Sequence, residues 1–177
     1  LSQEVDKNVL IPKLSHSSKI VTIVAGDEDL EGCDALITGN RNFSLGIKTA
    51  DCAAICFSDG KKIGIAHIGW RGFCLGLIQK MLTHFDAQNL EVYVGPFLHS
   101  FEMQKDFCYD QIAQKFGERF IEQENEKLIF NFKDAISSLL PSQTVYDSRN
   151  MATDLSLPSY RRGTSDRLVT VASFSAL

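Results

Sequence analysis

Short apolar runs separated by turn-forming residues dominate the first 70 residues of the chain. Five runs are rich in β-branched or other apolar side chains and are bounded by Gly, Asp and Asn, a pattern typical of strands. They cover residues 19–25, 34–38, 44–48, 53–57 and 62–68. This part of the chain is therefore predicted to form β-sheet.

Helical spacing follows the strand-rich part. Apolar residues recur along one helix face from Cys74 to Phe85 and again from Tyr109 to Phe120. The other predicted elements are strands at 91–95, 128–131 and 167–174 and a short helix at 133–140. Both apolar stripes are interpreted as core packing. The mixture predicts an α+β (mixed α/β) fold, in which antiparallel hairpins and helical crossovers share mixed sheets.

Composition limits the possible classes of protein. The chain has 177 residues, 44% of them hydrophobic, and a formal charge of −4, so we expect one catalytic domain over residues 1–177. The mild acidity argues against a nucleic-acid partner, and no apolar run approaches a membrane span. No secretory signal is recognised. The odd count of five cysteines indicates reduced thiols and a cytoplasmic location.

One hairpin brings two chemically active side chains together. Two predicted strands flank Asp59-Gly60, a dipeptide that favours a two-residue type I′ turn. That turn would place Cys52 directly opposite His67, with Cβ atoms roughly 4.5–5.5 Å apart. A one-residue slip would put the two side chains on opposite faces.

A thiol and an imidazole this close permit two chemistries. Both can bind one metal ion, since Zn–S bonds of ~2.3 Å and Zn–N bonds of ~2.0 Å fit the separation. Alternatively, His67 can deprotonate Cys52, which then acts as a nucleophile. A third interpretation has no functional content: Cys52 is a small buried side chain and His67 a hydrogen-bonded core histidine.

The residues after His67 form a glycine-flanked turn that leads toward the first predicted helix. Free backbone N–H groups and the helix dipole at such a turn favour an anion. Arg71 adds a planar cation suited to phosphate, Gly72 lets a ligand approach the backbone, and Trp70 can stack on a flat ring. We interpret this turn as an element that binds substrate or phosphate.

Three motifs together resemble a known family. They are Thr49-Ala50-Asp51-Cys52, His67-Ile68-Gly69-Trp70-Arg71-Gly72 and Ser159-Tyr160-Arg161-Arg162-Gly163. The chain resembles the YfiH family of multicopper polyphenol oxidases, or laccase-domain proteins, from about residue 14 to 174. Members are regarded as purine nucleoside phosphorylase-type enzymes. The resemblance implies phosphorolysis of adenosine and related nucleosides, adenosine deamination, and two mixed β-sheets flanked by helices.

The resemblance also implies a metal site of two histidines and one cysteine, here His16, Cys52 and His67. His16 rests on the resemblance alone. Zinc with an open position is the expected metal, and copper is the less favoured choice. The four histidines of the chain are too few for the copper centres of a multicopper oxidase.

Further roles and departures follow from the resemblance. Asp51 would orient a ligand or take a proton, although an aspartate beside a strand more often only accepts hydrogen bonds from backbone N–H groups. Arg161 and Arg162 would close the pocket around an anionic substrate, although a surface loop with paired arginines is the plainer interpretation. The segment 95–103 is two residues shorter than the family pattern, and Ala152 replaces a cysteine. These departures concern the substrate pocket more than the metal site.

Two other functions remain open at this point. A metal-free Cys–His hydrolase or deamidase would use Cys52 as nucleophile and His67 as base. A non-catalytic structural zinc module would need a fourth protein ligand, for which His99 is the only evident candidate.

Overall fold

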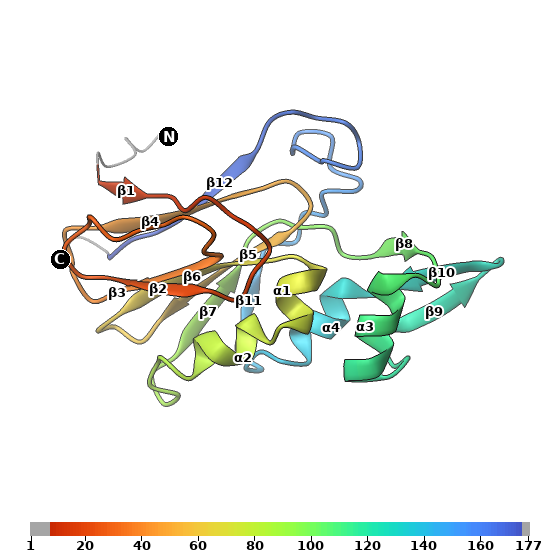
Figure 1. Cartoon of the computed structure of the whole chain (residues 1–177), viewed down its shortest axis with the longest axis horizontal. Coiled ribbons are helices and arrows are strands. Elements are labelled where there is room, and N and C mark those ends of the chain that lie inside the picture. Colours follow the sequence, from red (N-terminus) through yellow and green to blue (C-terminus); the bar gives the residue numbers. More distant parts are fainter. Residues whose placement is uncertain (1–7, 175–177) are drawn as a thin grey trace.

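The computed structural model describes residues 8–174, which form three β-sheets and four helices (Figure 1). The strands are β1 (Val9–Leu10), β2 (Ile20–Ile23), β3 (Ala35–Thr38), β4 (Ser44–Thr49), β5 (Ala53–Ser58), β6 (Ile63–Ile68), β7 (Glu91–Val94), β8 (Phe101–Met103), β9 (Ile121–Glu124), β10 (Lys127–Phe130), β11 (Val145–Tyr146) and β12 (Leu168–Ala172). The helices are α1 (Trp70–Cys74), α2 (Leu77–Leu82), α3 (Phe107–Phe116) and α4 (Phe132–Ser137).

Two of the sheets are mixed, as predicted. The larger has six strands in the order β11-β7-β5-β6-β3-β2, with parallel pairs at both edges and antiparallel pairs between them. The smaller has the order β1-β4-β12, parallel and then antiparallel. The prediction of a mixed α and β fold is confirmed. A third sheet, β8-β10-β9, is antiparallel and was not expected.

The six-stranded sheet is buried on both faces. Alternate residues of its central strands, such as Ile55 and Ile68, pack with Phe73 and Leu77 of the helices in one hydrophobic cluster. The opposite face packs against β4 and β12 in a second cluster. Figure 1 shows the same layers, with β4 and β12 on one side of the sheet and α1 and α2 on the other. His67 shares the β6 face that turns toward β4, at the end of the strand.

The predicted hairpin register is wrong by two residues. Ser58 pairs with Ile63, and Ala54, not Cys52, lies opposite His67. The turn has four residues because the carboxylate of Asp59 accepts the backbone N–H groups of Lys61 and Lys62, at 3.0 and 2.8 Å. A shift of two positions preserves the face. Cys52 therefore stays on the side of the sheet that His67 occupies.

The helix predicted from Cys74 to Phe85 is two short helices. Gly76 has a left-handed backbone with φ of +74°, which ends α1 and starts α2 in a new direction. The apolar stripe is nonetheless buried, with Leu77, Ile78 and Met81 fully inside. The second stripe forms α3, which ends before Gly117, so that Phe120 is buried beyond the helix.

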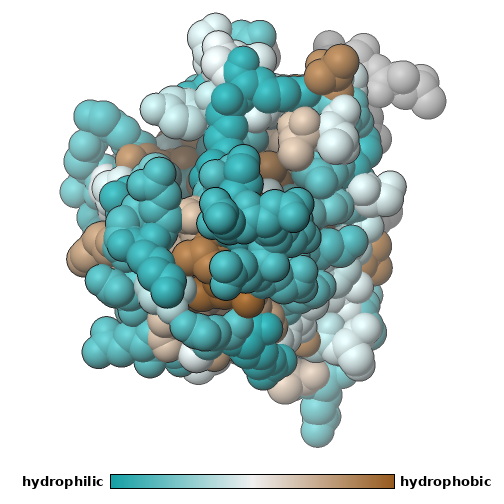
Figure 2. Space-filling model, turned by 90° about the vertical axis from the view of Figure 1, so that its right-hand side faces the viewer, coloured by the Kyte–Doolittle hydropathy of each residue, from teal (hydrophilic) through white to brown (hydrophobic). Residues whose placement is uncertain are grey.

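Four strands lie outside the predicted set: β1, β8, β9 and β11. Two of them contain only two residues, and β9 is IEQE, whose polar side chains give no strand signal. With α3, β9 and β10 form the end of the molecule that Figure 2 faces, where hydrophilic side chains predominate around a few hydrophobic ones. Within residues 8–174, every helix is too short or too polar to cross a bilayer.

Candidate metal centre and adjoining pocket

Three side chains from separate segments meet at the end of β6. His16 lies in the loop before β2, Cys52 directly precedes β5, and His67 is in β6. One ligand atom from each lies within 4.8 Å of the others, and no other group of three or more such side chains within residues 8–174 meets that test. Although the actual register differs from the predicted one by two residues, Cys52 still lies near His67. It occupies the same face of the sheet, diagonally across from the histidine.

Asp34 holds this arrangement in place. Its carboxylate is fully buried and lies 2.7 Å from Nδ1 of His67. The same carboxylate accepts the backbone N–H groups of Ser15, His16 and Ser17 at 3.2, 3.0 and 2.7 Å. Asp34 therefore orients one histidine directly and fixes the loop that carries the other. With Nδ1 of His67 occupied, Nε2 is the atom left to face Cys52.

Two residues of the site have backbones that side chains rarely adopt. His16 has φ of +58° and Asp51 has φ of +81°. Such conformations cost of order 1–3 kcal/mol and persist where surrounding contacts enforce them. At His16 the enforcing contacts are those of Asp34. At Asp51 the backbone N–H donates to the Met151 sulfur at 3.0 Å, and the backbone carbonyl accepts from Leu98 at 2.9 Å.

Gly69 leaves room for the three side chains. A Cβ atom at this position would lie 3.0 Å from Sγ of Cys52 and 3.3 Å from Cδ2 of His16. Contacts this short are rare for real side chains, so any larger residue would displace one of the ligands. The glycine before Trp70 is thus required by the site rather than by its own backbone angles.

The neighbouring charges reshape the acid–base properties of the site. Burial alone would raise the pKa of Cys52, but hydrogen bonds from His16 and His67 outweigh it and lower the pKa to about 7. Burial opposes the charge of His67, yet its bonds to Asp34 and Cys52 raise its pKa to about 9. The pKa of Asp34 is well below its usual range, since several donors overcome its burial. In the metal-free site a thiol that ionises near neutral pH therefore lies beside an imidazole that is protonated there.

A hollow of about 530 Å³ opens next to these groups. Its lining includes all three candidate ligands together with Asp51 and Arg71. The remaining lining residues are Leu14, Lys48, Thr49, Ala50, Tyr160, Arg161 and Arg167. Oδ2 of Asp51 accepts the backbone N–H of Arg161 at 2.9 Å, while its Oδ1 is buried without a hydrogen-bond partner within residues 8–174.

Some residues expected at the pocket do not line it. Trp70 packs against Phe107 and lies under the Arg71 guanidinium, outside the hollow. Gly72 is buried below the turn. The guanidinium of Arg162 donates to the carbonyl oxygens of Asp154 and Leu157, which places it inside its own loop. Of the predicted substrate-binding residues, only Arg71 and Arg161 face the cavity.

His99 stands apart from the metal group. Its ring packs 5.0 Å from that of Phe97, and its Nε2 is buried without a hydrogen-bond partner among the described residues. Sequence reasoning missed Asp34, Lys48, Tyr160 and Arg167 as site residues. The signal for Asp34 was weak: an acidic residue directly before an apolar strand.

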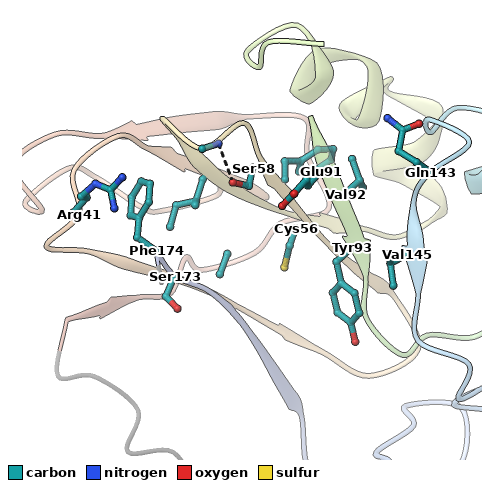
Figure 3. A pocket seen from close by; sticks show the side chains of 14 residues that line it. Arg41, Cys56, Ser58, Glu91, Val92, Tyr93, Gln143, Val145, Ser173 and Phe174 are labelled. Atoms are coloured by element: carbon teal, nitrogen blue, oxygen red, sulfur yellow. Dashed lines mark hydrogen bonds between the residues drawn. The ribbon is translucent and has the colours of Figure 1, made fainter. Parts of the chain in front are cut away.

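A larger hollow of about 710 Å³ lies elsewhere, against β5 and β7 (Figure 3). The one hydrogen bond drawn there joins the Gly60 N–H to the Ser58 hydroxyl at 3.2 Å. Its single thiol, Cys56, has a pKa raised to about 12 by burial. In size it exceeds the first hollow, but within residues 8–174 the one group of three possible metal ligands lies at the first hollow and not here.

The sequence as a whole matches a family described as multi-copper polyphenol oxidoreductase laccase, over residues 1–173. The chain belongs to that family, the YfiH family. The solved structure of YfiH from Bacillus licheniformis superposes with a TM-score of 0.79 at 21% identity, covering 92% of this chain and 73% of that one. A Neisseria meningitidis protein gives a TM-score of 0.82 at 22% identity, with 93% and 74% covered. Both support the fold.

Curated relatives in the YfiH family carry an enzyme name. A purine nucleoside phosphorylase of Aquifex aeolicus is 30% identical over 174 residues, covering 93% of this chain and 82% of the relative. A purine nucleoside phosphorylase of Rickettsia conorii is 28% identical, with 88% of this chain and 71% of the relative covered.

Proposed function

We propose that the protein is a metal-dependent enzyme that acts on purine nucleosides, with zinc held by His16, Cys52 and His67. The observation that carries the proposal is the meeting of three ligand atoms within 4.8 Å at the wall of a hollow of about 530 Å³. The name purine nucleoside phosphorylase, borne by relatives that align with most of this chain, supports nucleoside and phosphate as substrates.

The donor set fits zinc. One thiolate and two neutral imidazoles are preferred zinc ligands, and the pKa of Cys52 at about 7 makes the thiolate available. Asp34 on Nδ1 of His67 is the outer partner that zinc-bound histidines usually have. When bound at such a three-ligand site, zinc supplies a Lewis acid with an open coordination position. Copper remains the less favoured metal.

The chain's own residues would bind and orient the substrates. Arg71 and Arg161 both face the hollow, and guanidinium groups suit a phosphate dianion. The free Oδ1 of Asp51 can accept a hydrogen bond from a ribose hydroxyl or take a proton. Tyr160, 71% exposed at the rim, offers a ring to cover a flat base. Adenosine deamination at the same site is the second reaction we propose.

One observation favours a metal-free alternative. Asp34, His67 and Cys52 follow one another in the order of an orienting carboxylate, a base and a nucleophile. A Cys–His hydrolase or deamidase would use this chain of contacts without an ion. A structural zinc module has less support, because His99 is not part of the ligand group and no fourth ligand joins it within residues 8–174.

Product analysis tests the proposed reaction. Zinc-loaded protein is incubated with adenosine, with and without inorganic phosphate, and the products are separated by chromatography. Adenine with ribose 1-phosphate, formed only with phosphate, is the expected result, and inosine would show deamination. Failure to convert any purine nucleoside would contradict the proposal.

Thiol reactivity separates the two mechanisms. Zinc bound to Cys52 should protect it from iodoacetamide until a chelator is added, and the protein should contain about one zinc per chain. In the metal-free alternative, Cys52 reacts at once, chelator changes nothing, and activity persists without metal. Cys33 serves as the internal reference, because it is fully buried and its pKa is raised by that burial.

A further inference from the structure

The cavity at the metal centre continues outward past the residues that would hold a nucleoside. A second hollow, of about 440 Å³, adjoins it and shares Leu14, Lys48 and Arg167 with the first. Its other lining residues are Ile11, Pro12 and Lys13. Arg71 and Arg161 line only the inner hollow. Lys48 and Arg167 therefore lie where the two hollows join, farther out than Arg71 and Arg161.

The fold places these two cations side by side. Lys48 pairs with Val169 across β4 and β12, and Arg167 directly precedes β12. Gly46 lies on the same face of β4 as Lys48, and side chains of β1 and Ile11 approach to 3.0 Å from where its Cβ would be. The side chains that pack over Gly46 do not extend over Lys48, which is exposed and lines the hollow.

The charge around the opening is one-sided. Lys48, Arg71, Arg161 and Arg167 all line the inner hollow, and none forms an ion pair with a carboxylate within residues 8–174. Asp51 is the one acidic residue among the lining residues of both hollows in the described part of the chain. Arg167 is partly fixed, since its Nη1 donates to the carbonyl oxygens of Ser165 and Asp166 at 3.0 and 2.8 Å.

One phosphate dianion accounts for only part of this charge. In a protein with a net charge of −4, four unpaired cations around one opening are a local reversal of sign. Such a field attracts ligands with more than one negative group. Because the cations divide into an inner and an outer pair, the two negative groups would be held apart along the cavity.

We infer that Lys48 and Arg167 form a subsite for a second anionic group, carried by the substrate itself, so that the site takes purine nucleosides with a phosphorylated ribose. The inference rests on the proposed function for the nucleoside and extends it. The base and ribose would occupy the inner hollow, and the 5′-phosphoryl group would extend toward Lys48 and Arg167. Arg71 and Arg161 remain available for inorganic phosphate.

Binding measurements test the subsite independently of turnover. Zinc-loaded protein is titrated calorimetrically with adenosine and with adenosine 5′-phosphate. A charge-assisted contact from each cation should make the phosphorylated ligand bind at least about tenfold more tightly. Lys48→Gln should remove most of that advantage, because it weakens the binding of adenosine 5′-phosphate much more than the binding of adenosine, while Lys48→Arg should keep the advantage.

Lys61→Gln is the matched control, because Lys61 is an exposed lysine in the turn at the far end of the β5–β6 hairpin. It removes the same charge and should keep the full advantage. Equal affinities for the two ligands, or equal losses in Lys48→Gln and Lys61→Gln, would overturn the subsite.

Saturating inorganic phosphate distinguishes the two sources of an anion. If it abolishes the advantage of adenosine 5′-phosphate, Lys48 and Arg167 hold the co-substrate and the inference is wrong. If the advantage survives, the outer subsite is separate, as inferred. Lack of adenosine turnover bears on the proposed function alone, since these measurements record binding.

Discussion

Cys52 directly precedes β5 and Cys56 lies within it, four positions later, yet the two cysteines border different hollows. Cys52 borders the smaller one and has a pKa of about 7, because two histidines donate to its sulfur. Cys56 borders the larger one and has a pKa of about 12, because burial acts there without compensation. The difference shows that neighbouring hydrogen-bond donors, rather than cavity volume, decide how readily a buried thiol ionises.

The difference extends to the supporting residues. Behind Cys52 stand His67 and then Asp34, whose carboxylate also secures the loop of His16. Near Cys56 the hydrogen bond from the Gly60 N–H to the Ser58 hydroxyl belongs to the β5–β6 turn. Burial alone sets the pKa of the Cys56 thiol. The predictions that follow test this contrast in order of decreasing expected effect.

The largest contrast is in thiol reactivity. In metal-free protein near pH 7 we expect a large share of Cys52 and almost none of Cys56 to be ionised, since their pKa values are about 7 and about 12. Alkylation of Cys52 should rise with pH through neutrality, because the thiolate fraction rises, while Cys56 stays unmodified. Mass spectrometry of peptides alkylated across about pH 5–9 checks this. Comparable alkylation rates at Cys52 and Cys56 would contradict the difference between their pKa values.

Replacing the two cysteines in turn gives the next largest effect. If the proposed function holds, Cys52→Ser should lower phosphorolysis more than about 100-fold, because losing a direct metal ligand costs more than losing an outer partner. Cys56→Ser should change the rate less than about twofold. Steady-state kinetics on both zinc-loaded variants measure this. If Cys56→Ser were the damaging change, the site would lie at the larger hollow.

Asp34→Asn should weaken zinc binding about 10–100-fold, the usual cost of removing the carboxylate behind a ligating histidine. Competition with a chelating dye measures the affinity. Asp59→Asn is the control, because Asp59 is also buried and its carboxylate accepts the N–H groups of Lys61, Lys62 and Asp86. Both variants should lose stability, and only the first should lose zinc affinity.

The smallest effect is steric. Gly69→Ala should destabilise the protein by about 1–3 kcal/mol and weaken zinc binding a few-fold, because its Cβ crowds Cys52 and His16. Gly39→Ala is the control, since the nearest atoms to its Cβ would lie at 3.6 and 3.7 Å, an ordinary contact. Thermal unfolding and the dye assay follow both. Equal stability and equal zinc affinity of the two alanine variants would show that the site has room for a Cβ atom at position 69.

Several of these features were predictable from the sequence. The strand runs are long and apolar, so β3 to β6 were placed within one or two residues. The hairpin register failed because a side chain, the Asp59 carboxylate, sets the turn length, and dipeptide preference does not include that contact. Gly76 broke the predicted helix, since an apolar stripe at helical spacing continues across a left-handed residue.

The site was only partly predictable. Cys52 and His67 followed from strand parity, which survives a two-residue shift. Asp34 could not be found in this way, because its partner His67 lies 33 positions away. Lys48 and Arg167 meet through β4 and β12, a pairing that no local pattern indicates. His16 came from family resemblance alone, since a loop histidine has no periodicity.

The several hydrogen bonds that the Asp34 carboxylate makes have a consequence for how the site assembles. The residue adjoins β3, but it reaches a loop before β2 and a histidine in β6, so its partners meet only after those strands have paired. The donors His16, Cys52 and His67 come together only once this part of the chain has folded. If the site holds zinc as proposed, metal binding would therefore be coupled to folding.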